Sequence, residues 1–132
     1  MTLGSCSIVL YNKRNKTILL QLRDEHAPIY SNEYGFFGGH IENKEIPLGC
    51  IKRECLEELE YQLEAPKMIF MRYIQKAPRY HFVEEYNPNK PLTQHEGQDK
   101  KWFTYQELKS EKNISKSIKE RSIEIIKKLK LT

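Results

Sequence analysis

Three glutamates in the middle of the chain have a spacing that could bind a metal. Glu54, Glu57 and Glu58 stand at positions i, i+3 and i+4, and at about 100° per residue such positions share one narrow face of an α-helix. Like charges on one face repel each other, and a divalent cation would remove that repulsion. Carboxylate oxygens beside a glycine-rich backbone suit Mg²⁺ or Mn²⁺, which also bind substrate phosphates. The alternative is that these glutamates are ordinary solvated surface.

The glutamates belong to a longer pattern. Residues 39–61 read GHIENKEIPLGCIKRECLEELEY. This stretch resembles the Nudix box, Gx5Ex7REUxEExGU, in which U is an apolar residue. The matching positions are Gly39, Glu45, Arg53, Glu54, Glu57 and Glu58, with Cys55 and Tyr61 at the two U positions.

The chain departs from the family pattern at three positions. Glu60 stands where the family has its last glycine, at a helix end that commonly needs a left-handed residue, so we expect a different helix exit or local strain with the chemistry retained. Lys44 replaces the second glycine of the family's Gly-x-x-x-x-Gly-Glu. Phe37 stands where the family often has a proline before its double glycine.

The resemblance implies a reaction and a set of residue roles. In Nudix enzymes a water attacks a phosphorus of a diphosphate linkage in a nucleoside diphosphate derivative. Glu54, Glu57 and Glu58 would hold Mg²⁺, with Mn²⁺ as an alternative ion, and the carbonyl of Gly39 would be a further ligand. Arg53 and Glu45 would pair to orient the loop and the helix. A plain surface salt bridge is the other interpretation of that pair.

Two candidates lie outside the box. The segment His95-Glu96-Gly97-Gln98, followed by Trp102, is similar to a later segment of the bacterial mutator-type 8-oxo-dGTP pyrophosphohydrolases, whose glutamate reaches the metal from a loop. Glu96 is therefore a candidate ligand or general base, against the alternative of an ordinary loop carboxylate. Arg23 ends a segment that resembles the strand before the active-site loop of many Nudix hydrolases, and it is a candidate contact for a phosphate or base.

Hydrophobic periodicity predicts the elements that position these residues. Strands are expected at 7–11 and 17–22, joined by a polar turn, and at 35–41, 68–74, 80–86 and 102–105. A helix should begin at Pro47 and bury the stripe Leu48, Ile51, Cys55 and Leu59. A second helix near the end should bury Ile114, Ile118, Ile125, Ile126 and Leu129. By resemblance, the fold is α/β, the Nudix fold, an α/β/α sandwich with a mixed β-sheet, in a single domain covering residues 1–132.

Composition excludes several classes of protein. Hydrophobic residues make up 39% of the 132 residues, which is enough for a core and argues against wholesale disorder. No apolar run approaches the roughly 20 residues that span a bilayer, and nothing at the start resembles a signal peptide, so we expect a cytoplasmic protein without a membrane partner. Cys6, Cys50 and Cys55 lack CxxC spacing, which predicts neither a disulfide framework nor a zinc site.

The charge of the chain is unevenly distributed. The net charge is +4 in total, and residues 109–132 carry eight basic and three acidic residues, so the rest of the chain is slightly acidic. These basic residues include Lys112, Lys116, Lys119, Lys127, Lys128 and Lys130. They form a solvated helix face or, alternatively, a positive flank that attracts a polyphosphate. Because no recognition-helix motif or aromatic RNA-binding pattern accompanies the charge, a nucleic-acid partner is not expected.

The residues and the resemblance together predict a Mg²⁺-dependent Nudix hydrolase. Its partner would be a small nucleotide, with a nucleoside triphosphate of the house-cleaning type as the first substrate class. The alternatives are a nucleotide-sugar or dinucleoside-polyphosphate pyrophosphatase, and a non-catalytic nucleotide-binding Nudix domain. A homodimer is a further expectation, because dimers are frequent among Nudix proteins. The box is shared by all these enzymes, so it does not select the nucleotide.

Overall fold

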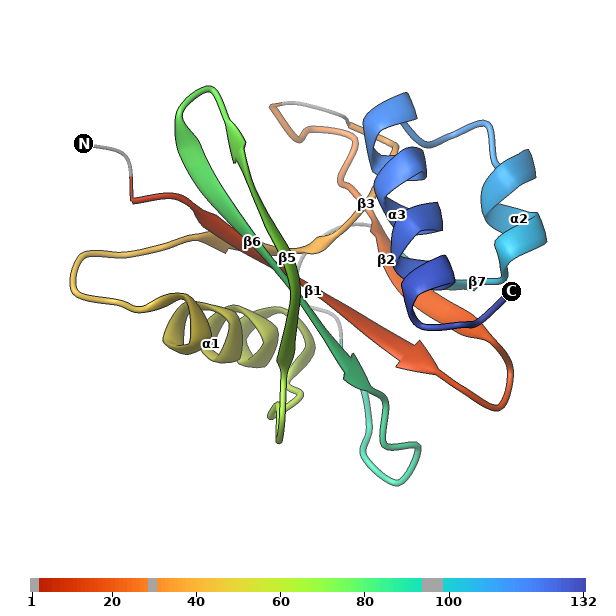
Figure 1. The fold of residues 1–132 in the computed structure, drawn as a ribbon, viewed down its shortest axis with the longest axis horizontal. Helices are drawn as coiled ribbons and strands as arrows, with labels where there is room; N and C mark the ends of the chain where they lie inside the picture. Colours follow the sequence, from red (N-terminus) through yellow and green to blue (C-terminus); the bar gives the residue numbers. More distant parts are fainter. Residues whose placement is uncertain (1–2, 29–30, 94–98) are drawn as a thin grey trace. The chain divides into compact units, whose positions relative to one another are not determined.

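The structure is a computed structural model that describes residues 3–28, 31–93 and 99–132. The chain divides into two compact units (Figure 1). The first consists of Met1–Val9 and Phe37–His95, and the second of Leu10–Phe36 and Glu96–Thr132. Strand β1, Ser5–Asn12, contributes to both units. Each unit is therefore discontinuous in sequence.

The first unit is built around the first half of β1. Strand β4, Phe37–His40, pairs with β1 antiparallel, with Ser5 opposite His40 and Ile8 opposite Phe37. Strand β6, Ala77–Glu85, is the other neighbour of β1, and β5, Lys67–Ile74, pairs antiparallel with β6. Figure 1 shows β1 and β6 running in the same direction, so the sheet is mixed. Helix α1, Pro47–Leu59, completes this unit.

The composition of β1 explains its central position. Cys6, Ile8, Val9 and Leu10 are each no more than 3% exposed, so consecutive side chains on both faces of the strand are buried. Such a continuous apolar run is typical of a strand covered on both faces. Helix α1 buries Ile51, Cys55 and Leu59 at helical spacing.

In the second unit, the end of β1 forms the predicted hairpin with β2, Thr17–Leu22, with Tyr11 opposite Ile18. Strand β2 also pairs antiparallel with β3, Tyr34–Gly35, and with β7, Asp99–Phe103. Helices α2, Tyr105–Ser110, and α3, Lys116–Lys128, follow. The rings of Tyr34 and Phe103 meet edge to face, with centroids 4.9 Å apart, a preferred geometry for aromatic pairs.

The α/β class and the mixed sheet are confirmed, while several local predictions are wrong. The expected strand at 35–41 is divided between β3 and β4. Tyr105, assigned to the last strand, begins α2 instead. Leu48 is 39% exposed and does not join the buried stripe of α1. Ile118 and Leu129 are only half-buried, and Ser122 lies in the buried face of α3 in their place.

The cysteines also differ from expectation. Cys6 of β1 and Cys50 of α1 form a disulfide, whereas Cys55 is free and buried. Burial raises the pKa of the Cys55 thiol to about 12, so this thiol is unreactive at neutral pH. The spacing of the cysteines, which predicted no disulfide framework, gave no signal for this single disulfide. The reason is topological, because the fold brings together two residues that are 44 positions apart in the sequence.

Among the helices that the structure describes, none has the length and apolar character needed to cross a membrane.

Candidate functional site

Helix α1 carries three glutamates with very different exposure. Pro47 occupies the first turn, as predicted, and the backbone N–H of Cys50 donates to the carbonyl of Ile46 at 3.0 Å. The side chain of Glu57 is 58% exposed and that of Glu54 is 14% exposed. Glu58 is 1% exposed. The narrow face that they share therefore runs from solvent into the interior of the first unit.

The double glycine of β4 meets two of these carboxylates. The backbone N–H of Gly38 donates to Glu58 Oε2 at 3.0 Å. A β-carbon at Gly39 would overlap the carboxylate of Glu54, and one at Gly38, where φ is +148°, would overlap the carbonyl of Cys6. Gly38 therefore requires glycine because the overlap is with backbone, whereas at Gly39 the flexible carboxylate of Glu54 would have to move aside. Phe37 precedes them as a fully buried strand residue.

Arg53 gathers the acidic side chains around one guanidinium group. Its Nε donates to Glu45 Oε2 at 2.5 Å, and its Nη2 donates to Glu45 Oε1 at 2.9 Å. Its Nη1 donates to Glu54 Oε1 at 3.0 Å and to Glu57 Oε2 at 3.2 Å. Nη2 also donates to the carbonyl of His40 at 3.1 Å. Arg53 thus links the loop before α1, the end of β4 and two box glutamates.

These contacts change the acid–base properties of the pair. The hydrogen bonds from Arg53, followed by the one from the Glu42 backbone, lower the pKa of Glu45 from 4.5 to about 2. The same contacts raise the pKa of the Arg53 guanidinium above its ordinary value. The Arg53 and Glu45 side chains are only 23% and 19% exposed. A bidentate pair of this kind is more strongly fixed than an ordinary surface salt bridge.

The two glycine replacements in the box keep the backbone shape that glycine favours. Lys44 has φ +70° in the loop before α1, where Glu42 N–H donates to Glu45 Oε1 at 2.9 Å. Glu60 ends α1 in the left-handed conformation, φ +50° and ψ +35°, and its N–H donates to the carbonyl of Leu56 at 3.0 Å. Of the two outcomes expected at Glu60, the structure shows strain at an unchanged exit.

The box residues suit a divalent cation by their chemistry but are not arranged around one. Within residues 3–28, 31–93 and 99–132, no group of three or more His, Cys, Asp and Glu side chains is arranged to hold a metal ion. Glu54 and Glu57 instead point to Arg53, and Glu58 engages Gly38. The donor set is nevertheless made of carboxylate oxygens beside a glycine backbone, which is the chemistry that Mg²⁺ and Mn²⁺ require. Glu54 and Glu57 would have to turn from Arg53 toward the ion.

The other two candidates are placed differently. Glu96 lies outside the residues that the structure describes. Arg23 belongs to the second unit and directly follows β2, where its backbone N–H donates to the backbone carbonyl of Glu33 at 2.9 Å and its own carbonyl accepts from Asn32 N–H at 3.2 Å.

The sequence did not identify two backbone groups of the site, the N–H of Gly38 and the carbonyl of His40. Residue types carry little information about backbone groups. The double glycine was the available signal, because it marks a place where another group approaches the chain closely.

The fold and the site define an α/β protein whose sheet presents a double glycine to an acidic helix, and the sequence comparison identifies the family. The family model described as NUDIX domain matches residues 1–124. The chain therefore belongs to the NUDIX family.

The individual relatives share less than a third of their aligned residues with this chain. A GDP-mannose pyrophosphatase from Yersinia pestis (strain Pestoides F) is 29% identical over 104 residues, which cover 71% of this chain and 52% of that protein. The chain thus spans about half the length of the curated relatives it matches. A NUDIX-family hydrolase from Clostridium perfringens has a TM-score of 0.72 at 20% identity, covering 98% of this chain and 99% of the other. A MutT NUDIX hydrolase from Burkholderia pseudomallei has a TM-score of 0.73 at 18% identity, covering 92% and 95%. These structures share the fold.

Proposed function

We propose that this chain is a Mg²⁺-dependent pyrophosphohydrolase that cleaves a diphosphate linkage in a nucleoside diphosphate derivative. The observation that carries the proposal is the arrangement around Arg53, which bonds Glu45, Glu54 and Glu57 while Glu54 lies against Gly39. Glu54 at Gly39 and Glu58 at Gly38, with Glu57 on the same helix face, would form a site for a cation and a phosphate. If these glutamates were ordinary solvated surface, Glu54 would not need to lie so close to the backbone of Gly39.

Each residue has a separate task in the proposed mechanism. Glu54, Glu57 and the carbonyl of Gly39 would hold Mg²⁺, with Glu58 completing the set through its second oxygen. An ion held by these residues would supply positive charge for the phosphoryl oxygens and would favour ionisation of the attacking water. Glu45 fixes the guanidinium of Arg53, and Arg53 keeps the carboxylates of Glu54 and Glu57 together before they turn toward the ion. Glu45 and Arg53 are therefore positioning residues.

The identity of the base that accepts the proton of the attacking water is also part of the proposal. Glu57 has the most exposed carboxylate of the three, so it can reach a water on the substrate side. Glu58 is buried and already accepts from Gly38, which favours binding of the ion through its second oxygen over the role of base. Glu96 remains a candidate from the sequence resemblance alone.

Two substrate classes are proposed, and each has its own support. A nucleoside triphosphate follows from the sequence resemblance to the mutator-type enzymes. A nucleotide sugar is favoured by the 29% identical GDP-mannose pyrophosphatase. We also propose that residues 1–132 act as a single domain in the cytoplasm, with Mn²⁺ able to replace Mg²⁺.

A substrate panel distinguishes these proposals. Nucleoside triphosphates, oxidised nucleotides, sugar nucleotides, dinucleoside polyphosphates and capped RNA would each be incubated with Mg²⁺, and released phosphates would be measured. Cleavage of one class identifies the substrate. If no compound is cleaved while nucleotide binding is detectable, the chain is a binding module and the proposed activity is wrong.

The substitution Glu57→Gln tests the assignment of the site. It removes a charge without changing the size of the side chain, so we expect Mg²⁺-dependent turnover to fall about 100-fold or more, and Mn²⁺ affinity measured by calorimetry to weaken. Glu120→Gln is the matched control, because Glu120 is 63% exposed on α3 compared with 58% for Glu57. Full activity of the Glu57 variant would overturn the assignment.

A further inference from the structure

Two arginines lie directly opposite each other on neighbouring strands of the first unit. In the register of β5 and β6, Arg72 pairs with Arg79, and Phe70 pairs with His81. The β-carbons of directly opposite residues are about 4.5–5.5 Å apart, and like charges at this spacing destabilise a sheet. Both arginines are only partly exposed, so salt screens their repulsion less than at an open surface. An anion bound between the two charges would remove this repulsion.

Hydrogen bonds orient both arginines toward this shared position. Arg72 Nε donates to His81 Nε2 at 3.4 Å, and Arg79 Nε donates to Ser5 Oγ at 3.0 Å. Ser7 Oγ is 2.7 Å from His81 Nδ1. Because His81 Nε2 accepts from Arg72, the ring hydrogen is assigned to Nδ1, which donates to Ser7. These partners fix the guanidinium groups and carry no charge of their own.

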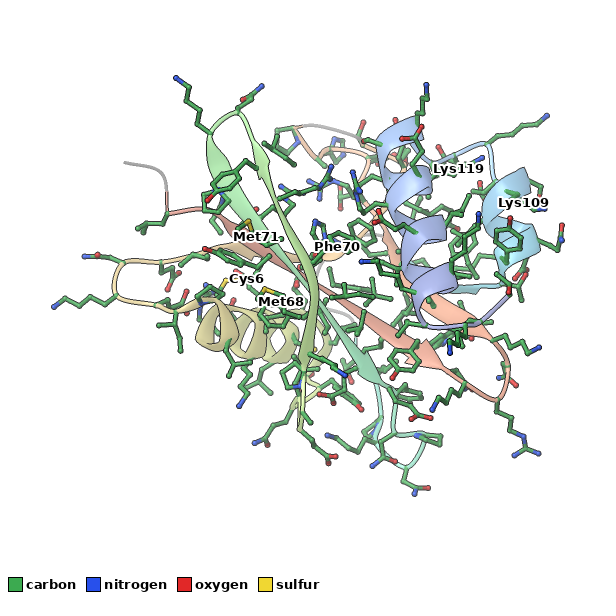
Figure 2. The ribbon with its side chains drawn as sticks, in the orientation of Figure 1. Cys6, Met68, Phe70, Met71, Lys109 and Lys119 are labelled. Carbon is green, nitrogen blue, oxygen red and sulfur yellow. A yellow bond between two sulfur atoms is a disulfide. The ribbon has the colours of Figure 1, made fainter. Side chains whose placement is uncertain are left out.

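The basic pair and its partners lie on the face of the sheet that is turned away from α1. Side chains alternate along a strand, and Cys6, between Ser5 and Ser7, is joined to α1 by the disulfide. The two serines therefore project from the opposite face, together with the groups that they contact on β6. Figure 2 shows the same alternation on β5, where Phe70 and Met71 lie on opposite sides of the strand. The pair is thus separate from the acidic face of α1.

A row of polar side chains connects this pair to the double-glycine strand. Ser5 is opposite His40 in the register of β1 and β4. The row across the sheet therefore consists of Arg72, Arg79, Ser5 and His40. His40 is exposed, and its carbonyl accepts from Arg53 at 3.1 Å. Because neighbouring strands are about 4.8 Å apart, an anion on β5 and β6 would lie roughly 10–14 Å from β4.

From these observations, we propose that Arg72 and Arg79 bind a phosphate group of the substrate that lies outside the scissile diphosphate linkage. Two guanidinium groups suit a phosphate, because each presents planar N–H donors that match the phosphate oxygens. Phosphates of one polyphosphate chain share a bridging oxygen, so they are much closer together than the width of two or three strands. The phosphate at the arginines therefore belongs to another part of the substrate.

Together with the proposed function, on which it rests, this site defines a substrate class. The substrate is a nucleoside diphosphate derivative with one further phosphate ester, on the nucleoside or on the group attached to the diphosphate. A nucleoside triphosphate has no such ester. The site thus favours derivatives in which the diphosphate joins two larger groups.

The first test measures the anion site without a metal ion and without turnover. Inorganic pyrophosphate in the presence of EDTA should raise the melting temperature of the natural chain as its concentration increases. Arg72→Gln and Arg79→Gln should each weaken the fitted affinity about 10-fold or more. Arg14→Gln is the matched control, because it removes the same charge from an exposed position in the turn between β1 and β2, and its affinity should be unchanged.

Each affinity is fitted from the shift within one variant, so a less stable variant does not imitate a loss of binding. The two arginine substitutions are independent, and either one that folds is sufficient. The proposal is wrong if pyrophosphate does not stabilise the natural chain. It is also wrong if the Arg72 and Arg79 variants bind pyrophosphate as tightly as the Arg14 variant.

The second test identifies the substrate class. ADP-ribose would be compared, with Mg²⁺, with ADP-ribose phosphorylated on the adenosine and ADP-ribose phosphorylated on the terminal ribose. One phosphorylated form should have a KM about 10-fold lower than ADP-ribose. Arg72→Gln should remove this difference, whereas Arg14→Gln should keep it. The preferred form shows which part of the substrate carries the further phosphate.

The two tests separate the anion site from the proposed enzymatic activity. Equal KM values for all three compounds would overturn the substrate class. If none of the compounds is cleaved although pyrophosphate binds through the two arginines, the proposed hydrolysis is contradicted while the anion site is confirmed.

Discussion

The carboxylate of Glu45 is held by Arg53, which donates two hydrogen bonds of 2.5 and 2.9 Å to it. The pKa of the carboxyl group is lowered to about 2 in the folded protein, compared with an ordinary value of 4.5. The folded state therefore binds fewer protons than the unfolded state between these two values. It follows that this pair stabilises the protein fully above about pH 4.5, and that the contribution is lost as the pH falls toward 2.

This linkage predicts a pH-dependent effect of Glu45→Gln. At pH 7 the variant should melt at a lower temperature than the natural chain, because the charge-assisted bonds are removed. The difference should shrink as the pH is lowered from 5 to 2.5, where the natural carboxyl group begins to be protonated. Thermal unfolding followed by circular dichroism at pH 7, 4 and 2.5 measures this effect.

The control for this prediction is Glu120→Gln. Glu120 lies 4.0 Å from Lys116 in an exposed i,i+4 pair, which contributes little to stability, so the melting temperature should barely change at any pH. A constant difference between Glu45→Gln and the natural chain from pH 7 to 2.5 would show that the pair does not titrate as expected.

At the residue scale, the sequence predicted side chains better than backbone groups. The spacing from Gly39 to Glu58 identified the charged residues that meet around Arg53. It did not identify the disulfide of Cys6 and Cys50, because that contact depends on how β1 is placed beside α1. Nor did it show that Glu58 is buried while Glu57 is exposed, since equal spacing on a helix says nothing of what covers each side chain.

At the scale of elements, the end of α1 shows how the fold tolerates an unfavourable residue. Glu60 adopts a left-handed conformation, which costs about 1–2 kcal/mol for a residue with a β-carbon. Glycine would remove this cost, although it loses about 0.5–1 kcal/mol more conformational entropy on folding. The balance still favours glycine at this position.

We therefore predict that Glu60→Gly stabilises the protein by about 0.5–1 kcal/mol. Urea denaturation at pH 7 would show a higher midpoint with an unchanged slope. The comparison variant is Lys52→Gly, within the same helix at an exposed position, which should destabilise by about 1 kcal/mol. If both glycines destabilise equally, the left-handed conformation of Glu60 carries no strain.

Helix α2 shows why one element was not predicted. Thr104 and Glu107 form a capping box, in which Thr104 N–H donates to Glu107 Oε1 at 2.9 Å and Glu107 N–H donates to Thr104 Oγ1 at 3.2 Å. This motif starts a helix, but the preceding aromatic residues Trp102 and Phe103 favoured a strand over the whole segment. The predicted strand exists as β7, which ends at Phe103, and the capping box at Thr104 then starts the helix.

At the scale of the whole molecule, some of the basic residues in 109–132 make local stabilising contacts, while others remain exposed to solvent. Lys119 Nζ donates to the carbonyls of Lys109 at 3.2 Å and Glu111 at 2.6 Å, at the end of α2 (Figure 2). A cation at a helix C-terminus interacts favourably with the helix dipole. The ammonium groups of Lys109 and Lys127 lie 4.5 and 6.0 Å from the ring centroid of Tyr105. These three lysines therefore stabilise the second unit.

The exposed lysines of this segment are available for a longer-range effect. We predict that changing Lys112, Lys116 and Lys130 together to Gln lowers kcat/KM severalfold toward an anionic nucleotide at about 0.01 M salt, where the Debye length is about 30 Å. The difference should disappear near 1 M salt, where the Debye length is about 3 Å. Steady-state kinetics at both salt concentrations would measure it.

The control separates local placement from net charge. Lys13, Arg14 and Lys16 are exposed in the turn between β1 and β2, and changing all three to Gln removes the same charge from another part of the second unit. If the segment 109–132 attracts the substrate through its position, only the first triple variant should lose activity at low salt. Equal losses would mean that the total charge of the molecule sets the encounter rate. No loss in either variant would leave these lysines as a solvated face and place nucleotide attraction entirely at the proposed metal site.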